Sequence, residues 1–168
     1  MAKQRQPWGR FAIKALLVSA AAVGVVAYAS DRYAIGTDTQ EVRCLPDHSV
    51  FLVDRHRVEP RRDTLMAFRA QGLDPYFEDG TLMAKELVGM PGDHVRIDET
   101  GVWINGEQRA EGFPHVNTLD LDFASLERDE AVPEGHYLFL APAPESYDGR
   151  YWGYVSEEQL AGRVHPLY

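Results

Sequence analysis

The sequence predicts a mainly β protein, an antiparallel β-sheet domain carried on one N-terminal transmembrane helix. Two observations support this prediction. A run without charged residues extends from Ala15 to Ala29, and from Val50 onward short apolar or alternating runs are separated by turn residues. Because the chain has 168 residues and 45% hydrophobic side chains, it can hold one modest core and is too short for two ordinary domains.

The N-terminal segment predicts membrane insertion with a fixed orientation. Its first 14 residues carry four basic side chains, and Asp31 follows the apolar run. Basic residues beside a membrane helix stay in the cytoplasm, so we expect a cytoplasmic N-terminus at residues 1–14, a signal anchor at 11–29 and an extracytoplasmic domain at 36–168. These boundaries describe a single-pass protein of the inner membrane with a periplasmic C-terminal domain.

A cleaved signal peptide is the alternative for the same segment. A helix needs about 20 mostly apolar residues to span the hydrocarbon core. The run reaches this length only from Phe11 onward, so that Lys14 has to snorkel. Ala27-Tyr28-Ala29 fits the A-x-A pattern that precedes a cleavage site. The mass of the mature protein distinguishes a retained anchor from a cleaved signal peptide, because a chain that begins at Ser30 has lost the anchor.

The body of the chain predicts β-strands, because apolar residues alternate or cluster in short runs. These runs are Val50–Val53, Thr64–Phe68, Leu82–Val88, His94–Ile97, Val102–Ile104 and Tyr137–Leu140. Asn105-Gly106 favours a type I′ hairpin turn, and Pro91-Gly92 suits a type II turn. Helical signals are limited to a turn within Leu119–Asp129 and another at Ser156–Gln159.

Composition argues against several kinds of ligand. The formal net charge of -9 and the pI near 5.1 disfavour nucleic acid, which binds clustered Lys and Arg. The six histidines are scattered and show no paired ligand spacing, and no cofactor motif is present. We therefore expect no nucleic acid, no metal and no cofactor.

Lys85 is the first candidate for chemistry. In the predicted strand Leu82–Val88 it lies on the same face as Met83 and Leu87, whereas Glu86 points the other way. A lysine held among apolar neighbours loses hydration, which disfavours the ammonium and makes the neutral amine a general base. The alternative is a lysine whose stem lies along the strand while its head reaches solvent, which is the commoner state.

Cys44 is the second candidate. It is the only cysteine, so it has no partner for an intrachain disulfide. Pro46 restricts Leu45 to extended geometry, which suits a strand-like approach. A nearby neutral lysine can deprotonate the thiol, and the ammonium then stabilises the reactive thiolate. The alternative is a small buried hydrophobe, which is common for free cysteine.

Five segments occur in a fixed order: Cys44-Leu45-Pro46, Arg62–Phe68, Lys85–Asp93, Val102–Gly106 and Ser146–Gly153. Together they resemble the signal peptidase I superfamily, peptidase family S26. The first is similar to the Ser-Leu-Pro form of its conjugative-transfer branch, which matures pilins. The most specific match is the segment from Lys85, which opens at the position of the general-base lysine and ends in Pro-Gly-Asp. The resemblance spans the chain from the anchor to the C-terminus.

The resemblance implies a role for each matching residue. Lys85 is then the general base, Cys44 is the attacking group in place of a serine, and Ser146 is a hydroxyl that helps to orient the lysine amine. Asp148 and Arg150 are then a buried structural ion pair. From the residues alone, an Asp and an Arg two apart in a strand share a face and can bridge, or they are ordinary surface charges.

Three departures from the family pattern bear on activity. Cys44 replaces the serine, and Val42 stands where the family often has a serine that helps to bind the oxyanion, so other donors are needed. The Gly-Asp-Asn stretch expected after Tyr137–Leu140 is Ala141–Pro144, and Gly149 replaces the second serine of the last motif. We therefore expect an altered shape around the lysine.

The resemblance implies a membrane-anchored endopeptidase with a Cys44–Lys85 dyad. It would cleave after small residues of a membrane-inserted precursor, a propilin or another secreted protein, and the lipid bilayer would be its second partner. Water would release the acyl-enzyme, or the substrate's own N-terminus in a cyclising variant. The alternative is a catalytically inactive scaffold or chaperone of a conjugation or secretion apparatus that keeps the fold and Lys85.

Overall fold

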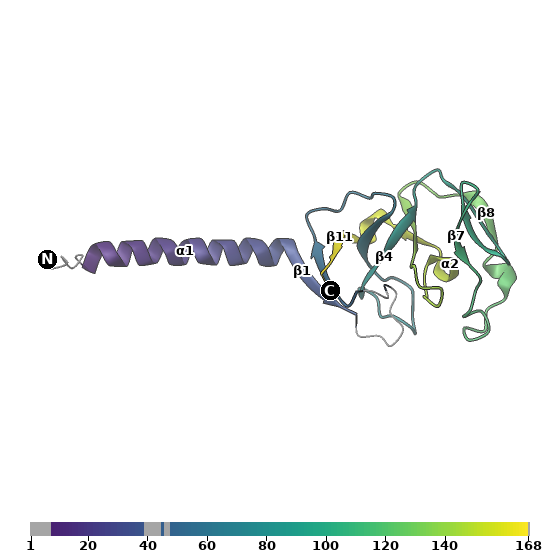
Figure 1. The fold of residues 1–168 in the computed structure, drawn as a ribbon, viewed down its shortest axis with the longest axis horizontal. Coiled ribbons are helices and arrows are strands. Elements are labelled where there is room, and N and C mark those ends of the chain that lie inside the picture. Colours follow the sequence, from purple (N-terminus) through teal and green to yellow (C-terminus); the bar gives the residue numbers. More distant parts are fainter. Residues whose placement is uncertain (1–7, 39–44, 46–47, 168) are drawn as a thin grey trace.

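The structure is a computed structural model that describes residues 8–38, 45 and 48–167. A long helix projects from one end of a β-rich body and runs directly into its first strand (Figure 1). This helix, α1, covers Trp8–Arg32, is rich in the strong helix former Ala, and has no buried residue. Its length and composition suffice to cross a membrane. It extends three residues beyond each end of the predicted anchor at residues 11–29.

Two antiparallel sheets make up the body. Sheet A has seven strands in the order β1-β2-β11-β3-β4-β9-β10. Their bounds are β1 Tyr33–Thr37, β2 Val50–Asp54, β3 Thr64–Arg69, β4 Leu82–Gly89, β9 His136–Leu140, β10 Tyr154–Ser156 and β11 Leu160–Pro166. Sheet B has four strands in the order β7-β6-β5-β8. Their bounds are β5 His94–Asp98, β6 Gly101–Ile104, β7 Glu107–Glu111 and β8 Arg128–Ala131. Sheet B lies at the end of the body farthest from α1 (Figure 1).

The mainly β prediction is confirmed, and all six predicted strands are present, each one residue longer than predicted. Both hairpin positions at Asn105 and Gly106 have positive φ, 52° and 85°, as the type I′ turn requires. Gly92 has φ 83°, which fits the predicted type II turn. The predicted helical signals are short 3₁₀ turns, Phe123–Ser125 and Glu157–Gln159.

Five strands were missed: β1, β7, β8, β10 and β11. The first four are the edge strands of the two sheets, and between them they have a single buried residue, Val155, so they lack the apolar run that marks an interior strand. β11 is internal, but Gly162 interrupts its pattern at an irregular register with β3. A Cβ on Gly162 would lie 2.4 Å from the backbone oxygen of Asp54, so glycine allows the close approach of β11 to β2.

The strand β9 joins the two halves of the core. Four of its five residues are buried, and they point alternately to opposite sides. Tyr137 and Phe139 pack into a cluster with β3 and β4, whereas Leu138 and Leu140 pack into a cluster with sheet B. Because it is covered on both faces, β9 reads as a continuous apolar run in the sequence.

Candidate active site

The side chain of Lys85 is buried in the core of sheet A. It lies on β4 with Met83 and Leu87 on the same face, as strand alternation predicts, and it is 1% exposed. Its directly opposite neighbour on β3 is Met66, which is fully buried. The alternative of a lysine head in solvent is therefore wrong, and an amine in these surroundings has lost most of its hydration.

Ser146 is brought to the lysine from a loop 61 residues further along the chain. The Nζ atom of Lys85 donates a hydrogen bond to Oγ of Ser146 at 2.7 Å. Both side chains are buried, with Ser146 3% exposed. A hydroxyl at this distance helps to fix the direction of the amine.

The ion pair of Asp148 and Arg150 is buried, but the strand geometry expected for it is wrong. Asp148 is the N-cap of a one-turn helix, α2 (Gly149–Trp152), and accepts from the backbone N–H of Arg150. The guanidinium then folds back onto the carboxylate in a two-pronged pair, with Nε to Oδ1 at 2.8 Å and Nη2 to Oδ2 at 3.0 Å. Their exposed fractions are 0% and 1%, so these are not surface charges.

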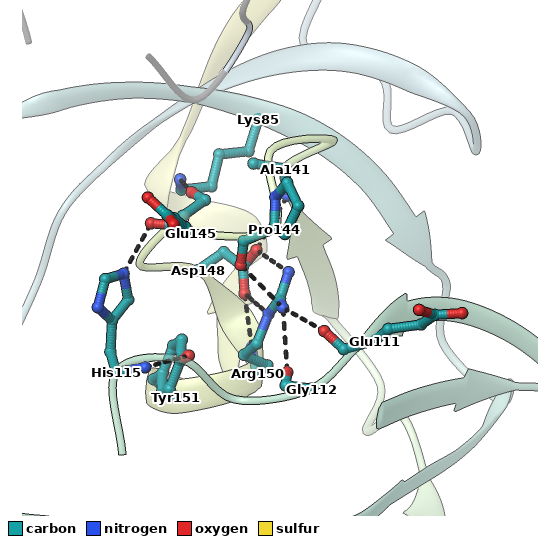
Figure 2. A network of polar contacts seen from close by, with 11 residues as sticks. Lys85, Glu111, Gly112, His115, Ala141, Pro144, Glu145, Asp148, Arg150 and Tyr151 are labelled. Atoms are coloured by element: carbon teal, nitrogen blue, oxygen red, sulfur yellow. Dashed lines mark hydrogen bonds and ion pairs between the residues drawn. The ribbon is translucent and has the colours of Figure 1, made fainter. Parts of the chain in front are cut away.

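The same ion pair holds the loop through Pro144 and Glu145 (Figure 2), which leads directly to Ser146. Arg150 Nη1 donates to the carbonyl oxygen of Pro144 at 3.3 Å, and to those of Glu111 and Gly112 at 3.3 and 3.2 Å. Asp148 accepts from the backbone N–H of Ala141 at 3.1 Å. Both ends of the loop between β9 and α2 are therefore fixed by charged groups that have no access to water.

His115 and two tyrosines brace the outer side of this loop; the tyrosines belong to the Ser146–Gly153 motif, whereas no sequence pattern indicated His115. Nε2 of His115 donates to the carbonyl oxygen of Glu145 at 2.7 Å, and its backbone N–H donates to Oη of Tyr151 at 3.1 Å. Tyr147 stacks against Tyr151 with ring centroids 5.8 Å apart. Burial raises the pKa of both phenols, so they remain neutral contacts.

Glycine at position 149 has a packing reason. α2 lies directly on β9, and a Cβ on Gly149 would stand 2.6 Å from the carbonyl oxygen of Phe139 and 2.8 Å from Cδ1 of Leu138. No larger residue fits this backbone. The Ala141–Pro144 stretch is compact as well, because Ala141 and Ala143 are both buried.

A cleft of about 210 Å³ has a largely apolar lining that includes Lys85. Its walls come from the edge strand β1, from β2 and β3, and from the first half of β4. The lining residues are Gly36, Thr37, Asp38, Leu45, Phe51, Val53, Ala67, Phe77, Thr81, Leu82, Met83, Ala84 and Lys85. Ala67 and Ala84 are small side chains in this lining, and strand alternation places them on the face of sheet A opposite to the side chain of Lys85.

Cys44 and Val42 lie outside the described residues. Leu45, the next residue in the chain, is described: it is 6% exposed and lines the cleft together with Lys85. Among the described residues, no group of three or more His, Cys, Asp or Glu side chains is placed to hold a metal ion.

Comparison with known proteins gives consistent results. Residues 8–168 match the model of a family described as signal peptidase, peptidase S26. A probable signal peptidase I-2 of Synechocystis is 33% identical over 81 residues, which are 48% of this chain and 35% of that protein. Signal peptidase IB of Staphylococcus aureus is 26% identical over 118 residues, 61% of this chain and 58% of that protein.

A crystal structure of a signal peptidase I from Enterococcus faecalis is also similar. It is 27% identical, with a TM-score of 0.39, and the match covers 62% of this chain and 96% of that one. The chain spans about one third to three fifths of the length of the two curated relatives described above.

Proposed function

This chain belongs to the signal peptidase family, peptidase S26, and from that premise we propose that it is a membrane-anchored endopeptidase that cleaves membrane-inserted precursor proteins. The observation that carries the proposal is the hydrogen bond of 2.7 Å between the buried amine of Lys85, which lines the cleft, and Ser146. A buried lysine whose amine is oriented by a hydroxyl and which lines a cleft is suited to move protons. α1 supplies the anchor.

In the proposed reaction Cys44 is the nucleophile and Lys85 the general base. Lys85 Nζ takes the proton of the Cys44 thiol, and the sulfur attacks the scissile carbonyl carbon to form a tetrahedral intermediate. The lysine ammonium then gives the proton to the leaving amine, and the carbon–nitrogen bond breaks to leave a thioester. Lys85 next deprotonates a water molecule that attacks the thioester and releases the thiolate. Ser146 accepts a hydrogen bond from the amine and keeps it directed at the reacting atoms.

The substrate would lie along the cleft in extended form. The cleft reaches from the edge strand β1 to the lysine, and an edge strand offers unpaired backbone groups to a peptide. The largely apolar lining, together with membership of the signal peptidase family, favours a small apolar residue next to the scissile bond. Because Cys44-Leu45-Pro46 resembles the conjugative branch, a propilin is the substrate we propose, with water or the substrate's own N-terminus releasing the acyl group.

Thiol labelling tests the proposed dyad. A thiol that transfers its proton to Lys85 reacts with iodoacetamide at neutral pH far faster than an isolated thiol, because the thiolate is the nucleophile. Lys85→Met preserves the volume and apolar surroundings but removes the base, so we expect labelling of Cys44 to fall about tenfold or more. Arg61→Met is the control for loss of one exposed positive charge. Equal labelling rates in wild type and Lys85→Met would contradict the dyad and favour an inactive scaffold.

A further inference from the structure

The junction of α1 and sheet A contains no linker. Arg32 is the last residue of the helix, and Tyr33 is the first residue of β1. The backbone N–H of Arg55, just past the end of β2, donates to the carbonyl oxygen of Arg32 at 2.8 Å. A terminal carbonyl of the helix is thus satisfied by the sheet, which ties the helix axis to β2.

A buried carboxylate at the end of β2 strengthens this connection. Asp54 is 3% exposed and receives both Nε and Nη2 of Arg32, at 3.0 and 2.7 Å. The backbone N–H of His56 also donates to Oδ1 of Asp54 at 3.2 Å, and Nε of Arg57 lies 3.6 Å from Oδ2 of Asp54. The hydrogen bonds from Arg32 hold the pKa of Asp54 below its usual range. A two-pronged pair of this kind fixes an angle as well as a distance.

The remaining nitrogen of Arg32 binds the helix itself. Nη1 donates to Oη of Tyr28, one turn earlier, at 2.7 Å. A helix of 25 residues is about 37 Å long, which exceeds the hydrocarbon thickness of about 30 Å. The helix is therefore long enough for its last turn to stand at the boundary between membrane and water, where tyrosine is favoured.

We propose that Arg32 and Asp54 are positioning residues, which hold the cleft at a fixed height and angle over the bilayer. This inference rests on the proposed function. The strand that carries Lys85 is three strands away from β2 in sheet A, which corresponds to about 14 Å. A swing of about 20° at the junction would move Lys85 by about 5 Å, more than the 3.3 Å of one extended residue.

The consequence differs between two kinds of substrate. A precursor with its own transmembrane helix in the same bilayer presents its scissile bond at a set height, so a shift of 5 Å places the wrong bond opposite the base. A short soluble peptide has no such constraint, because it can bind the cleft at any height or angle of the domain over the bilayer. The Arg32–Asp54 pair therefore affects the rate of cleavage of the membrane-inserted substrate and leaves the rate of peptide cleavage unchanged.

The test compares both substrates on the full-length protein in lipid vesicles. One substrate is a synthetic precursor with a single transmembrane helix followed by an Ala-x-Ala segment, and the other is a soluble peptide of the same segment. In Asp54→Asn we expect kcat/KM for the precursor to fall about tenfold or more and that for the peptide to stay within about twofold. Arg32→Lys, which keeps the charge and loses the two-pronged geometry, should give the same split, and it replaces Asp54→Asn if that variant does not fold.

Asp31→Asn is the matched control. Asp31 is one residue from Arg32. Within the described part of the chain, its exposed carboxylate pairs with the exposed ring of His56. It should leave both rates unchanged. Equal losses on the two substrates in Asp54→Asn, or no loss on either, would overturn the proposed positioning role.

A distance measurement separates this inference from the proposed function. Spin labels are placed on Ala22→Cys in α1 and on Glu158→Cys in the exposed turn before β11, in a Cys44→Ser background. We expect the distance distribution to broaden in Asp54→Asn and not in Asp31→Asn, and an unchanged distribution in Asp54→Asn would overturn the inference. If the wild type cleaves neither substrate, the proposed function fails, and the distance measurement still tests the junction.

Discussion

Replacing Arg150 with methionine tests how much the buried ion pair contributes to the fold. The guanidinium makes two hydrogen bonds to Asp148 and reaches three carbonyl oxygens, and both side chains are excluded from water. In Arg150→Met the carboxylate stays buried without its partner. Breaking a buried pair in this way costs about 3–5 kcal/mol, because the remaining charge is uncompensated. A loss of about 4 kcal/mol lowers the unfolding midpoint by about 12 °C for a chain of this size.

Thermal unfolding of the full-length protein in detergent, followed by near-ultraviolet circular dichroism, measures this effect. Arg96→Met is the matched control, because Arg96 also pairs with an aspartate two residues away, Asp98 at 3.2 Å, but with both side chains substantially exposed. An exposed pair contributes about 0.5 kcal/mol or less, so the control should unfold close to wild type. Equal shifts in the two variants, or no shift in Arg150→Met, would refute the argument from burial.

Three further outcomes are expected. Gly149→Ala should lower the unfolding midpoint by several degrees, since its Cβ has no room over β9, whereas Gly36→Ala, with open space around it, should not. Ser146→Ala should lower kcat for precursor cleavage about tenfold while the unfolding midpoint stays near wild type, because it removes the partner of Lys85; unchanged kcat would contradict an orienting role. Burial by itself raises the pKa of Asp93, but hydrogen bonds from its neighbours lower it overall. Its stabilising contribution is therefore full above about pH 4 and is lost as pH falls through its folded-state pKa, so urea unfolding of Asp93→Asn should show a smaller acid loss than wild type.

The position of Lys85 could be predicted because a strand has a fixed period of two. Once Leu82–Val88 is assigned as a strand, Met83 and Leu87 mark its buried face, and the lysine between them has to share it. The strand period of two gave the wrong local structure for Asp148 and Arg150, which lie at a helical turn. A single helical turn brings them together, and four residues are too few to show a helical pattern.

Contacts between distant segments could not be read from the sequence. The hydrogen bond between His115 and the carbonyl of Glu145 joins two loops 30 residues apart, and neither loop has a repeating pattern. The pair of Arg32 and Asp54 likewise depends on β1 lying beside β2, and β1 is an edge strand without alternation. Cys44 remains a prediction from its place before Leu45 and Pro46, because it lies outside the described residues.

Processing of a membrane-inserted precursor tests the central claim most directly. Wild type, Cys44→Ala and Lys85→Met are each incubated in vesicles with the precursor that carries the Ala-x-Ala segment, and the products are identified by intact mass. Cleavage after the small residue by wild type, with none by either variant, is the predicted result. Cleavage by Cys44→Ala at the wild-type rate would contradict the proposed mechanism.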